Sequence, residues 1–276
     1  MIQSMPWSSW LRLWARHAQT PGFAYRLRGA VELCRSGAEH APYLASLSGG
    51  KDSAAMVGVM VEAGLLGFQC AVAHSSLTTP GSVETAVAIC DKYGLPLDGE
   101  EPDSDPLEVL RDLPTDADAL SGPSMDRLYR VCGAGNLMVN YAYKSHAPGA
   151  REEGGFRASF QGLRADESRG RRASLATHGP VYRNTVDGMW RVCPLARWTV
   201  RDVYAYCVSR GVPIHPFYQR YCDELGGDPE GHGARVDLVV APDTVAQRGA
   251  LQPVRRLYPE LWAKLLRVRP EIARYG

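Results

Sequence analysis

The stretch that decides the fold is Ser48-Gly49-Gly50-Lys51-Asp52-Ser53, which lies between two apolar segments. Residues 42–47 (PYLASL) have the length and composition of a buried strand, and residues 54–65 are apolar at almost every position, as in a buried helix. Two consecutive glycines let the backbone pass close to an anion, and the free N–H groups that begin a helix point toward one. The sequence therefore predicts an anion-binding loop between a strand and a helix.

The polar side chains of this loop fit the same chemistry. Lys51 adds a positive charge, and the hydroxyl of Ser53 can donate to a phosphate oxygen. Asp52 is unexpected beside a phosphate, so we expect it to cap the helix or to meet a metal ion. The loop differs from a Walker A loop, because its lysine follows the glycine pair directly and precedes an aspartate. A glycine-rich turn with a helix cap is the structural alternative.

Strand and helix continue to alternate after the loop. Residues 68–73 (FQCAVA) are predicted as a strand, residues 80–93 as a helix with Ser82 as its N-cap, and residues 95–97 as a third strand. This alternation is typical of a parallel sheet with crossover helices, in which ligands bind beyond the carboxyl ends of the strands. We therefore expect an α/β fold with the glycine-rich loop at the ligand-binding edge.

Hydrophobic periodicity assigns the rest of the chain. Thr199 and Asp202 have the spacing of a capping box at the start of a helix. The further predicted elements are helices over residues 8–38 with a break near Pro21, over 125–145, over 199–210 and over 242–274, a strand over 157–163 and a loop over 222–235.

Composition excludes several classes of protein. The 276 residues are 45% hydrophobic and 22% charged, which is the balance of a globular protein rather than a disordered or coiled-coil chain. A net charge of +1 excludes a wholly basic nucleic-acid coat. No apolar run approaches the ~18 residues of a membrane span, and the first residues lack the pattern of a signal peptide. We therefore expect a cytoplasmic protein without a membrane partner.

The 7 cysteines include no CxxC pair, so buried, reduced thiols and no protein-bound metal are expected. A cluster held by Cys132, Cys193, Cys207 and Cys222 is the alternative. The position of Cys207 on the apolar stripe of a predicted helix argues against that cluster.

A second group of anion-binding residues lies in residues 162–172 (GLRADESRGRR). Arginine presents a planar fork of donors that fits phosphate or sulfate. Asp166 and Glu167 are expected to orient these arginines or to cap a turn. Taken alone, the segment also has the pattern of a charged surface loop.

Taken together, these segments resemble a known superfamily. SGGKDS after a strand resembles the PP-loop of the N-type ATP pyrophosphatases, which include sulfonucleotide reductases, the small subunit of ATP sulfurylase, tRNA thiolases and several synthetases. Residues 162–168, 193–204 and 211–218 resemble, in the same order, three further segments of the PAPS reductase family. The resemblance spans residues 44–221 and implies a Rossmann-like, adenine nucleotide alpha-hydrolase-like domain that cleaves ATP between its α and β phosphates.

The resemblance also implies a domain division and a set of site residues. The domains would be an N-terminal helical segment (1–40), the ATP-binding domain (41–221) and a C-terminal loop with a basic helical extension (222–276). The residues implied to bind the nucleotide are Ser48, Gly49, Gly50, Lys51, Asp52, Ser53, His74 and Gly162. A second anion would meet Arg164, Arg169 and Arg172, and catalysis would fall to Lys51, Asp52 and Arg164, with ATP and Mg²⁺ as cofactors. Trp198 is expected to be a packing residue that seats the helix beginning near Thr199.

The sequence departs from the reductases at one decisive point. Their C-terminal Glu-Cys-Gly-(Ile/Leu)-His segment carries the thiol that attacks sulfur, and this chain lacks it; its last cysteine is Cys222. We therefore expect an ATP pyrophosphatase that adenylates an acceptor in sulfur transfer, with a cysteine desulfurase or other protein as sulfur donor. The alternatives are a sulfonucleotide reductase that uses Cys222, an ATP sulfurylase-type enzyme and a non-catalytic nucleotide sensor.

The C-terminal region suits a nucleic-acid acceptor, as in DNA phosphorothioation. Residues 248–274 contain seven basic and two acidic residues, with leucines that form an apolar side. Such a segment is either a surface helix docked on the domain or a basic surface for nucleic acid or an acidic partner. N-terminal arginines could extend that surface, namely Arg12, Arg16, Arg26, Arg28 and Arg35.

Overall fold

The computed structural model describes residues 5–100, 105, 107–108, 111, 155–185, 188–231, 234, 236 and 251–275. In these residues, six strands form one sheet in the order β3-β2-β1-β4-β6-β5. The strands are β1 Tyr43–Ser46, β2 Gln69–Ala73, β3 Leu97–Glu100, β4 Ala158–Phe160, β5 Val181–Arg183 and β6 Trp190–Val192. Neighbouring strands are parallel except β5 and β6, which are antiparallel.

The strand order reverses between β1 and β4. On one side of β1 the chain adds β2 and then β3. On the other side the strands lie in the order β4, β6 and β5. Leu44 of β1 pairs with Ser159 of β4 at this reversal. In open α/β sheets, ligands bind outside the carboxyl ends of the strands at such a point. SGGKDS leaves the carboxyl end of β1, so the topology places the loop there.

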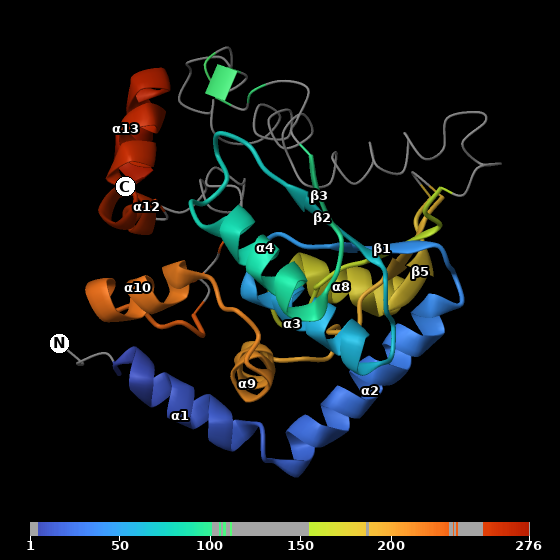
Figure 1. The fold of residues 1–276 in the computed structure, drawn as a ribbon. Coiled ribbons are helices and arrows are strands. Elements are labelled where there is room, and N and C mark those ends of the chain that lie inside the picture. The colour runs from blue at the N-terminus through green and yellow to red at the C-terminus, as the bar shows by residue number, and fades with distance from the viewer. Residues whose placement is uncertain are drawn as a thin grey trace.

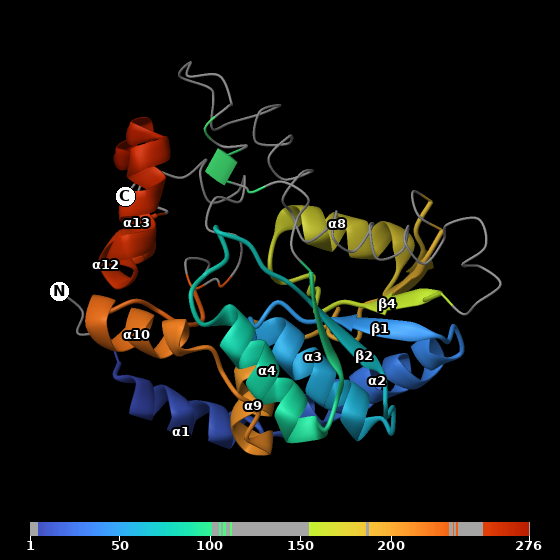
Figure 2. The ribbon, with the colours of Figure 1, turned by 45° about the horizontal axis from the view of Figure 1, so that its top comes forward.

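Helices cover both faces of the sheet. The helices are α1 Trp7–His17, α2 Pro21–Ala38, α3 Lys51–Glu62, α4 Ser82–Tyr93, α8 Arg169–His178, α9 Val200–Arg210, α10 Pro216–Leu225, α12 Gln252–Leu257, α13 Pro259–Val268 and the 3₁₀ helix η1 Pro270–Tyr275. Figures 1 and 2 show α1, α2, α3, α4 and α9 on one side of the sheet, with α12 and α13 beyond α10. Figure 2 shows α8 on the opposite face.

The main core lies between the sheet and the larger helical layer. Ala45, Cys70, Phe160 and Val192 point from four adjacent strands into a single cluster that includes residues of α2, α3, α4 and α9. The indole of Trp198 is 1% exposed, and its Nε1 donates to the carbonyl of Arg26 in α2 at 3.2 Å. Trp198 is therefore the packing residue that the sequence predicts before α9.

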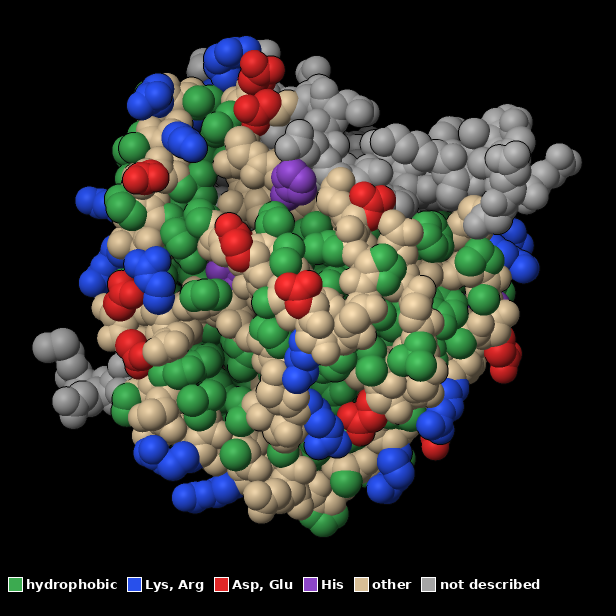
Figure 3. Space-filling view, viewed as in Figure 1, with side chains coloured by type: hydrophobic (Ala, Val, Ile, Leu, Met, Phe, Trp, Pro, Cys, Tyr) green, Lys and Arg blue, Asp and Glu red, His purple; other side chains and the backbone are tan. Residues whose placement is uncertain are grey.

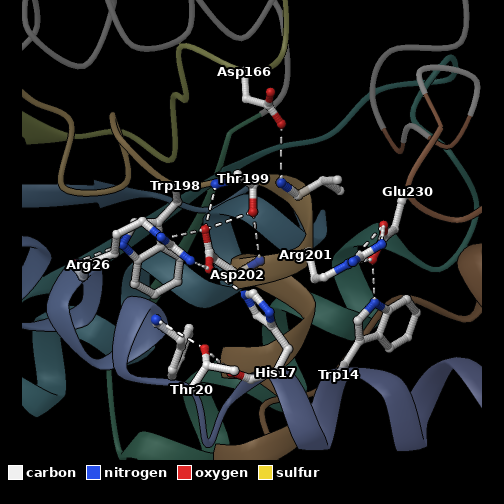
Figure 4. Close-up of polar contacts among 12 residues, drawn as sticks. Trp14, His17, Thr20, Arg26, Asp166, Trp198, Thr199, Arg201, Asp202 and Glu230 are labelled. Atoms are coloured by element: carbon white, nitrogen blue, oxygen red, sulfur yellow. Dashed lines mark hydrogen bonds and ion pairs between the residues drawn. The ribbon is translucent and has the colours of Figure 1, made fainter.

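A buried carboxylate ties the N-terminal helices to α9. The side chain of Asp202 is fully buried, and it accepts hydrogen bonds from Arg26 Nη2 at 2.7 Å and from His17 Nε2 at 2.8 Å. It also accepts from the backbone N–H of Thr199 at 2.8 Å, completing the predicted capping box. Figure 4 shows this hub, with Glu230 nearby holding the indole of Trp14 at 2.8 Å. Burial alone would raise the pKa of Asp202. The hydrogen bonds that it accepts from Arg26, His17 and Thr199 lower the pKa by more, so it lies below its ordinary value.

The predicted Rossmann-like parallel sheet with helical extensions at both ends is confirmed. The helix predicted over 54–65 begins earlier, at Lys51, and the break near Pro21 separates α1 from α2. The antiparallel pair β5 and β6 is an addition that the sequence analysis did not predict. The helix predicted over 125–145 lies outside the described residues, as do residues 242–250.

Two local predictions are wrong. Ser82 is not the N-cap of α4: Gly81, with φ of 98°, holds that position, and Ser82 Oγ lies 3.4 Å from His215 Nε2 instead. Residues 222–225 are not part of a loop, because α10 continues to Leu225. The helix extends because Cys222 is buried in the core, and it ends at Gly226, whose φ of 67° is left-handed. No helix in the described ranges has the length and apolar run that crossing a bilayer requires.

Candidate functional site at the start of α3

The SGGKDS loop turns tightly between β1 and α3. Gly49 has φ of 76°, and a Cβ there would lie 2.8 Å from the Cα of Ser82 and collide with its carbonyl oxygen. Ser53 Oγ donates to the carbonyl of Gly50 at 3.0 Å and accepts from the backbone N–H of Ser48 at 3.2 Å. The position of Gly49 thus requires glycine, and the two serines hold the turn closed.

The first turn of α3 is left open. Its N-cap, Gly50, has no side chain to cap it, and the N–H groups of Asp52 and Ser53 have no hydrogen-bond partner in the described part of the chain. Gly162, just after β4, lies against this turn, where a Cβ would come within 2.9 Å of the backbone nitrogen of Ser53. Glycine at position 162 therefore keeps these groups uncovered. Open N–H groups at the positive end of a helix dipole form an anion-binding feature.

Two buried cations meet at Asp52. Its carboxylate lies 3.1 Å from Lys51 Nζ and 2.5 Å from Arg164 Nε. Lys51 and Arg164 are 5% and 3% exposed, whereas the side chain of Asp52 is 18% exposed and faces the open edge. The prediction that Asp52 caps α3 is not met, because both of its oxygens are engaged by side-chain cations. Asp52 and Arg164 are 112 residues apart in the sequence, and the parallel pairing of β1 and β4 brings them together.

Electrostatics keeps all three groups charged. Burial alone would raise the pKa of Asp52. The positive charges of Lys51 and Arg164 lower this pKa by more, so it lies below its ordinary value. Burial lowers the pKa of Lys51, but Asp52 raises it above its ordinary value, and the pKa of Arg164 is raised in the same way. Asp52 and Asp166 together balance the charges of Lys51 and Arg164, so two buried cations lie beside the open helix start within a cluster that is close to neutral.

Aromatic rings form the floor under Lys51. Its Nζ lies 5.1 Å from the ring centre of Tyr218 and 5.9 Å from that of Tyr204. The hydroxyl of Tyr218 accepts the backbone N–H of Lys51 at 3.3 Å, and the ring of Tyr204 stacks on Trp14 at 4.0 Å. The sequence analysis did not name Tyr218 as a site residue, although it lies in the family-like segment 211–218, and that was the available signal.

The acidic residues after β4 orient the arginines, as predicted. Glu167 accepts the backbone N–H of Arg164 at 3.0 Å and forms an ion pair with Arg171 of α8. Asp166 lies 3.4 Å from Arg164 Nη1 and accepts the N–H of Val200 at the start of α9 at 3.3 Å. These bonds fix the backbone on which Arg164 reaches Asp52.

Other predicted site residues lie away from this centre. Arg169 and Arg172 are exposed on α8, and neither contacts the loop in the residues that the structure describes. His74 follows the carboxyl end of β2, where its Nε2 would lie 3.4 Å from a Cβ on Gly99 of β3. The structure thus unites Ser48, Gly49, Gly50, Lys51, Asp52, Ser53, Gly162 and Arg164, and places His74 at the same edge of the sheet but one strand further out.

The cysteines lie in packed surroundings. Cys222 is 1% exposed and its thiol donates to the carbonyl of Met5 at 3.1 Å, away from the loop. Cys207 packs beneath α3, with its Sγ 3.9 Å from the carbonyl of Lys51. Burial raises the pKa of both thiols, which disfavours the thiolate that a nucleophile requires. Across the described segments, no group of three or more His, Cys, Asp or Glu side chains is arranged to hold a metal ion; Cys132 lies outside them.

A family of known proteins matches most of the chain. Residues 42–232 match the phosphoadenosine phosphosulfate reductase domain family. An uncharacterized 37.8 kDa protein in the gpa 5' region of Escherichia phage 186 is 32% identical over 82 residues, which is 29% of this chain and 23% of that relative. The match thus spans less than a quarter of the relative's length.

One solved structure, a phosphoadenylyl-sulfate reductase, supports the fold. The phosphoadenylyl-sulfate reductase from Candida auris, in its phosphate complex, aligns with a TM-score of 0.50 at 15% identity over 72% of this chain and 86% of that one. The U34-tRNA thiolase NcsA from Methanococcus maripaludis aligns with a TM-score of 0.45 at 14% identity over 87% and 78%. Since the family match covers more than half of the 276 residues, this chain belongs to the phosphoadenosine phosphosulfate reductase domain family.

Proposed function

We propose that this chain is an ATP pyrophosphatase that adenylates an acceptor and releases pyrophosphate in a sulfur-transfer reaction. The observation that carries the proposal is the open first turn of α3, flanked by the buried cations Lys51 and Arg164. The N–H groups of Asp52 and Ser53 supply donors in fixed positions, and the two cations supply charge. Together they fit the phosphates of a nucleotide better than a neutral ligand.

The proposed step is a displacement at the α-phosphorus. An oxygen of the acceptor forms a bond to that phosphorus, the bond to the oxygen that bridges the α and β phosphates breaks, and pyrophosphate leaves with the bonding electron pair. Negative charge therefore grows on the β-phosphate side. Lys51, Arg164 and the first-turn N–H groups would stabilise that charge, which is how most phosphoryl-type transfers are catalysed. No thiol is needed, in keeping with the burial of Cys222.

The loop fits a Mg²⁺ ion that arrives with the nucleotide. Mg²⁺ retains several waters and binds through one or two carboxylates plus phosphate oxygens, and Asp52 is the one carboxylate of SGGKDS. The ion would supply charge neutralisation on the phosphates. Asp52, whose side chain is 18% exposed, would exchange part of its pairing with Lys51 and Arg164 for that ion.

The remaining predicted residues have roles within this proposal. His74, at the carboxyl edge of the sheet, would lie toward the adenosine, and Gly162 would let the phosphates approach α3. Arg164, with Arg169 and Arg172 of α8, would meet a second anion. Sulfur would come from a cysteine desulfurase or another sulfur donor protein.

Product analysis with Mg²⁺ and ATP labelled at the α-phosphate tests the proposal. Without the acceptor, water takes its place at the α-phosphorus, so AMP and pyrophosphate are expected, with a rate that falls about a hundredfold or more in Lys51→Ala, because one preorganised charge is lost. Lys92→Ala, an exposed change on α4, is the matched control and should retain the parent rate. Melting temperatures of both variants show whether Lys51→Ala is folded. If it is not, Lys51→Arg, which keeps the positive charge, provides a second test of the role of residue 51.

Other products would replace the proposal. ADP and phosphate would exclude cleavage between the α and β phosphates. Tight ATP binding without any product, with and without DNA or RNA, would favour a nucleotide sensor. Thioredoxin-dependent release of sulfite from a sulfonucleotide, abolished by Cys222→Ser, would favour a reductase despite the buried position of that thiol.

A further inference from the structure

The C-terminal helices present a basic surface. Arg255 and Arg256 of α12 and Lys264 and Arg267 of α13 are exposed, and we call these four residues the C-terminal basic surface. The opposite side of α13 is apolar and buried through Leu261, Trp262 and Leu265. The helix is therefore docked by its apolar side and leaves its charged side to solvent. Figure 3 shows Lys and Arg side chains over this region, at the upper left of the view, with fewer Asp and Glu side chains among them, such as the exposed Glu260 of α13.

Most of the charge on this surface is not balanced by neighbours. Arg256, Lys264 and Arg267 have no ion-pair partner in the described part of the chain. Some arginines elsewhere are paired, as Arg201 is with Glu230 at 2.7 Å and Arg210 with Glu62 at 3.1 Å. The C-terminal basic surface thus keeps charge that an anionic partner can use.

One helix connects this surface to the SGGKDS loop. At its start, α10 places the hydroxyl of Tyr218 on the N–H of Lys51 at 3.3 Å. Two residues later, Arg220 donates to the carbonyl of Leu257 in α12 at 3.0 Å and lies 5.5 Å from the ring centre of Tyr258. Figures 1 and 2 show α12 and α13 beyond α10, at the end of the sheet where α4 begins. A long anion bound along α12 and α13 would therefore lie beside the proposed nucleotide site.

The arginines of the N-terminal helices do not extend this surface. Arg12, Arg16 and Arg28 are exposed on α1 and α2, which line the opposite side of the molecule from α13 in both views. Arg26 is engaged by the buried carboxylate of Asp202. The arginines of α1 and α2 therefore do not add to the C-terminal basic surface.

We propose that the C-terminal basic surface binds the phosphate backbone of a nucleic acid, and that this nucleic acid is the acceptor of the proposed adenylation. The second half of this inference rests on the proposed function. Lys264 and Arg267 are neighbours on one face of α13, and Arg255 and Arg256 continue the charge onto α12. A line of cations over two helices fits a polymer of regularly spaced phosphates, and arginine favours phosphate through its planar fork.

Fluorescence anisotropy with labelled oligonucleotides of about 20 nucleotides, longer than a typical single-strand site, tests the surface. The full chain is titrated with DNA and RNA from about 50 to 200 mM salt. The variant R256Q/K264Q/R267Q removes three charges without reversing any. It should bind at least about tenfold more weakly at the lowest salt, and the slope of log affinity against log salt should fall by about 2–3. The matched control R12Q/R16Q/R28Q removes the same charge on α1 and α2 and should change affinity less than about twofold.

The titrations with DNA and with RNA, together with an acidic peptide, show which anion the surface binds. Tighter binding of DNA than RNA, or the reverse, identifies the source of the phosphates. Absence of oligonucleotide binding by the parent, an equal loss in the control variant, or tighter binding of a labelled polyglutamate peptide would each overturn the proposal. Melting temperatures show that both triple variants fold.

ATP binding, measured by calorimetry without nucleic acid, separates this inference from the proposed function. If the parent binds oligonucleotide but not ATP, the proposed function fails and the surface stands. If ATP is cleaved to AMP and pyrophosphate but no oligonucleotide binds, the surface fails and the proposed function stands.

Discussion

The first turns of α9 and α3 look alike in sequence and differ in purpose. Each carries an aspartate that pairs with a distant arginine, Asp202 with Arg26 and Asp52 with Arg164. Asp202 is fully buried and also caps its own helix through Thr199. Asp52 is partly exposed and caps nothing.

This difference separates a structural joint, where a helix start connects other helices, from a site that can bind a ligand. At α9, side chains accept the N–H groups of Val200 and Asp202, and the carboxylate of Asp202 holds α1 and α2 in place through His17 and Arg26. At α3, the N–H groups of Asp52 and Ser53 have no partner in the described residues, and the buried cations Lys51 and Arg164 lie beside them. Backbone N–H groups that have no partner at a helix start can donate hydrogen bonds to a ligand.

The largest effect is expected from Asp202→Asn. It leaves Arg26 and His17 without their buried anion, and breaking such a buried pair costs about 3–5 kcal/mol. The free energy of unfolding in urea measures the loss. Asp91→Asn, an exposed change on α4, should stay within about 0.5 kcal/mol of the parent. A loss below about 1 kcal/mol in Asp202→Asn would mean that the hub is not the joint described here.

The start of α10 adds a third case, a neutral cap, and predicts the next largest effect. His215 is 1% exposed, its Nδ1 accepts the N–H of Phe217 at 3.0 Å, and burial lowers its pKa to about 4. Because the folded-state pKa lies below the ordinary value of 6.5, protonation favours unfolding. Stability should be complete above pH 6.5 and fall by about 3 kcal/mol as the pH drops toward 4.

Urea unfolding at a series of pH values measures this slope. His215→Asn retains an acceptor for the N–H of Phe217 and does not titrate, so its curve should be flatter between pH 6.5 and 4. Identical slopes in parent and variant would assign the acid sensitivity to other groups. Asp202, whose pKa is lowered, contributes only as the pH falls below its ordinary range, so the two windows are distinct.

Asp52→Asn sharpens the comparison between the two aspartates. Since this side chain is partly exposed, the loss of stability should be about 1–2 kcal/mol, below that of Asp202→Asn. Without Mg²⁺, ATP should bind several-fold more tightly, because Lys51 and Arg164 lose their neutralising anion. Release of pyrophosphate with Mg²⁺ should fall. A stability loss equal to that of Asp202→Asn, with ATP binding unchanged, would erase the distinction between joint and site.

The smallest effect is expected from Tyr218→Phe. The change keeps the ring under Lys51 but removes the acceptor for its backbone N–H, which is worth about 1 kcal/mol. If α10 positions the loop, the KM for ATP should rise while the melting temperature changes little. Tyr221→Phe, in the same helix, is the control, and an equal change in its KM would refute a specific role for Tyr218.

Much of the fold was predictable because its signals are local. The alternation over residues 42–97 identified the parallel sheet, and the spacing of Thr199 and Asp202 identified the start of α9. Predictions failed where packing outweighed local preference. Ser82 has a typical capping side chain, but Gly81 caps α4 with a left-handed φ, and Cys222 is held in the core so that α10 continues past it.

The candidate site divides in the same way. The glycines, Lys51 and Ser53 were predictable from one hexapeptide, because a helix start that follows a strand is a local arrangement. The family-like motifs pointed to Arg164, but not to its bond with Asp52. Nothing in the spacing of Arg169 and Arg172 showed that they would be exposed on α8, away from the loop.

Local sequence was sufficient to predict the strands and helices of residues 42–97, the anion-binding loop and the capping box, since each depends on residues a few positions apart. Only the tertiary structure decided which charges meet. Asp52 and Arg164 are 112 positions apart, and Lys51 and Tyr218 are 167 positions apart. The physical reason is that a parallel sheet and the packing of α10 bring distant segments together, and burial there fixes partners that no local pattern encodes.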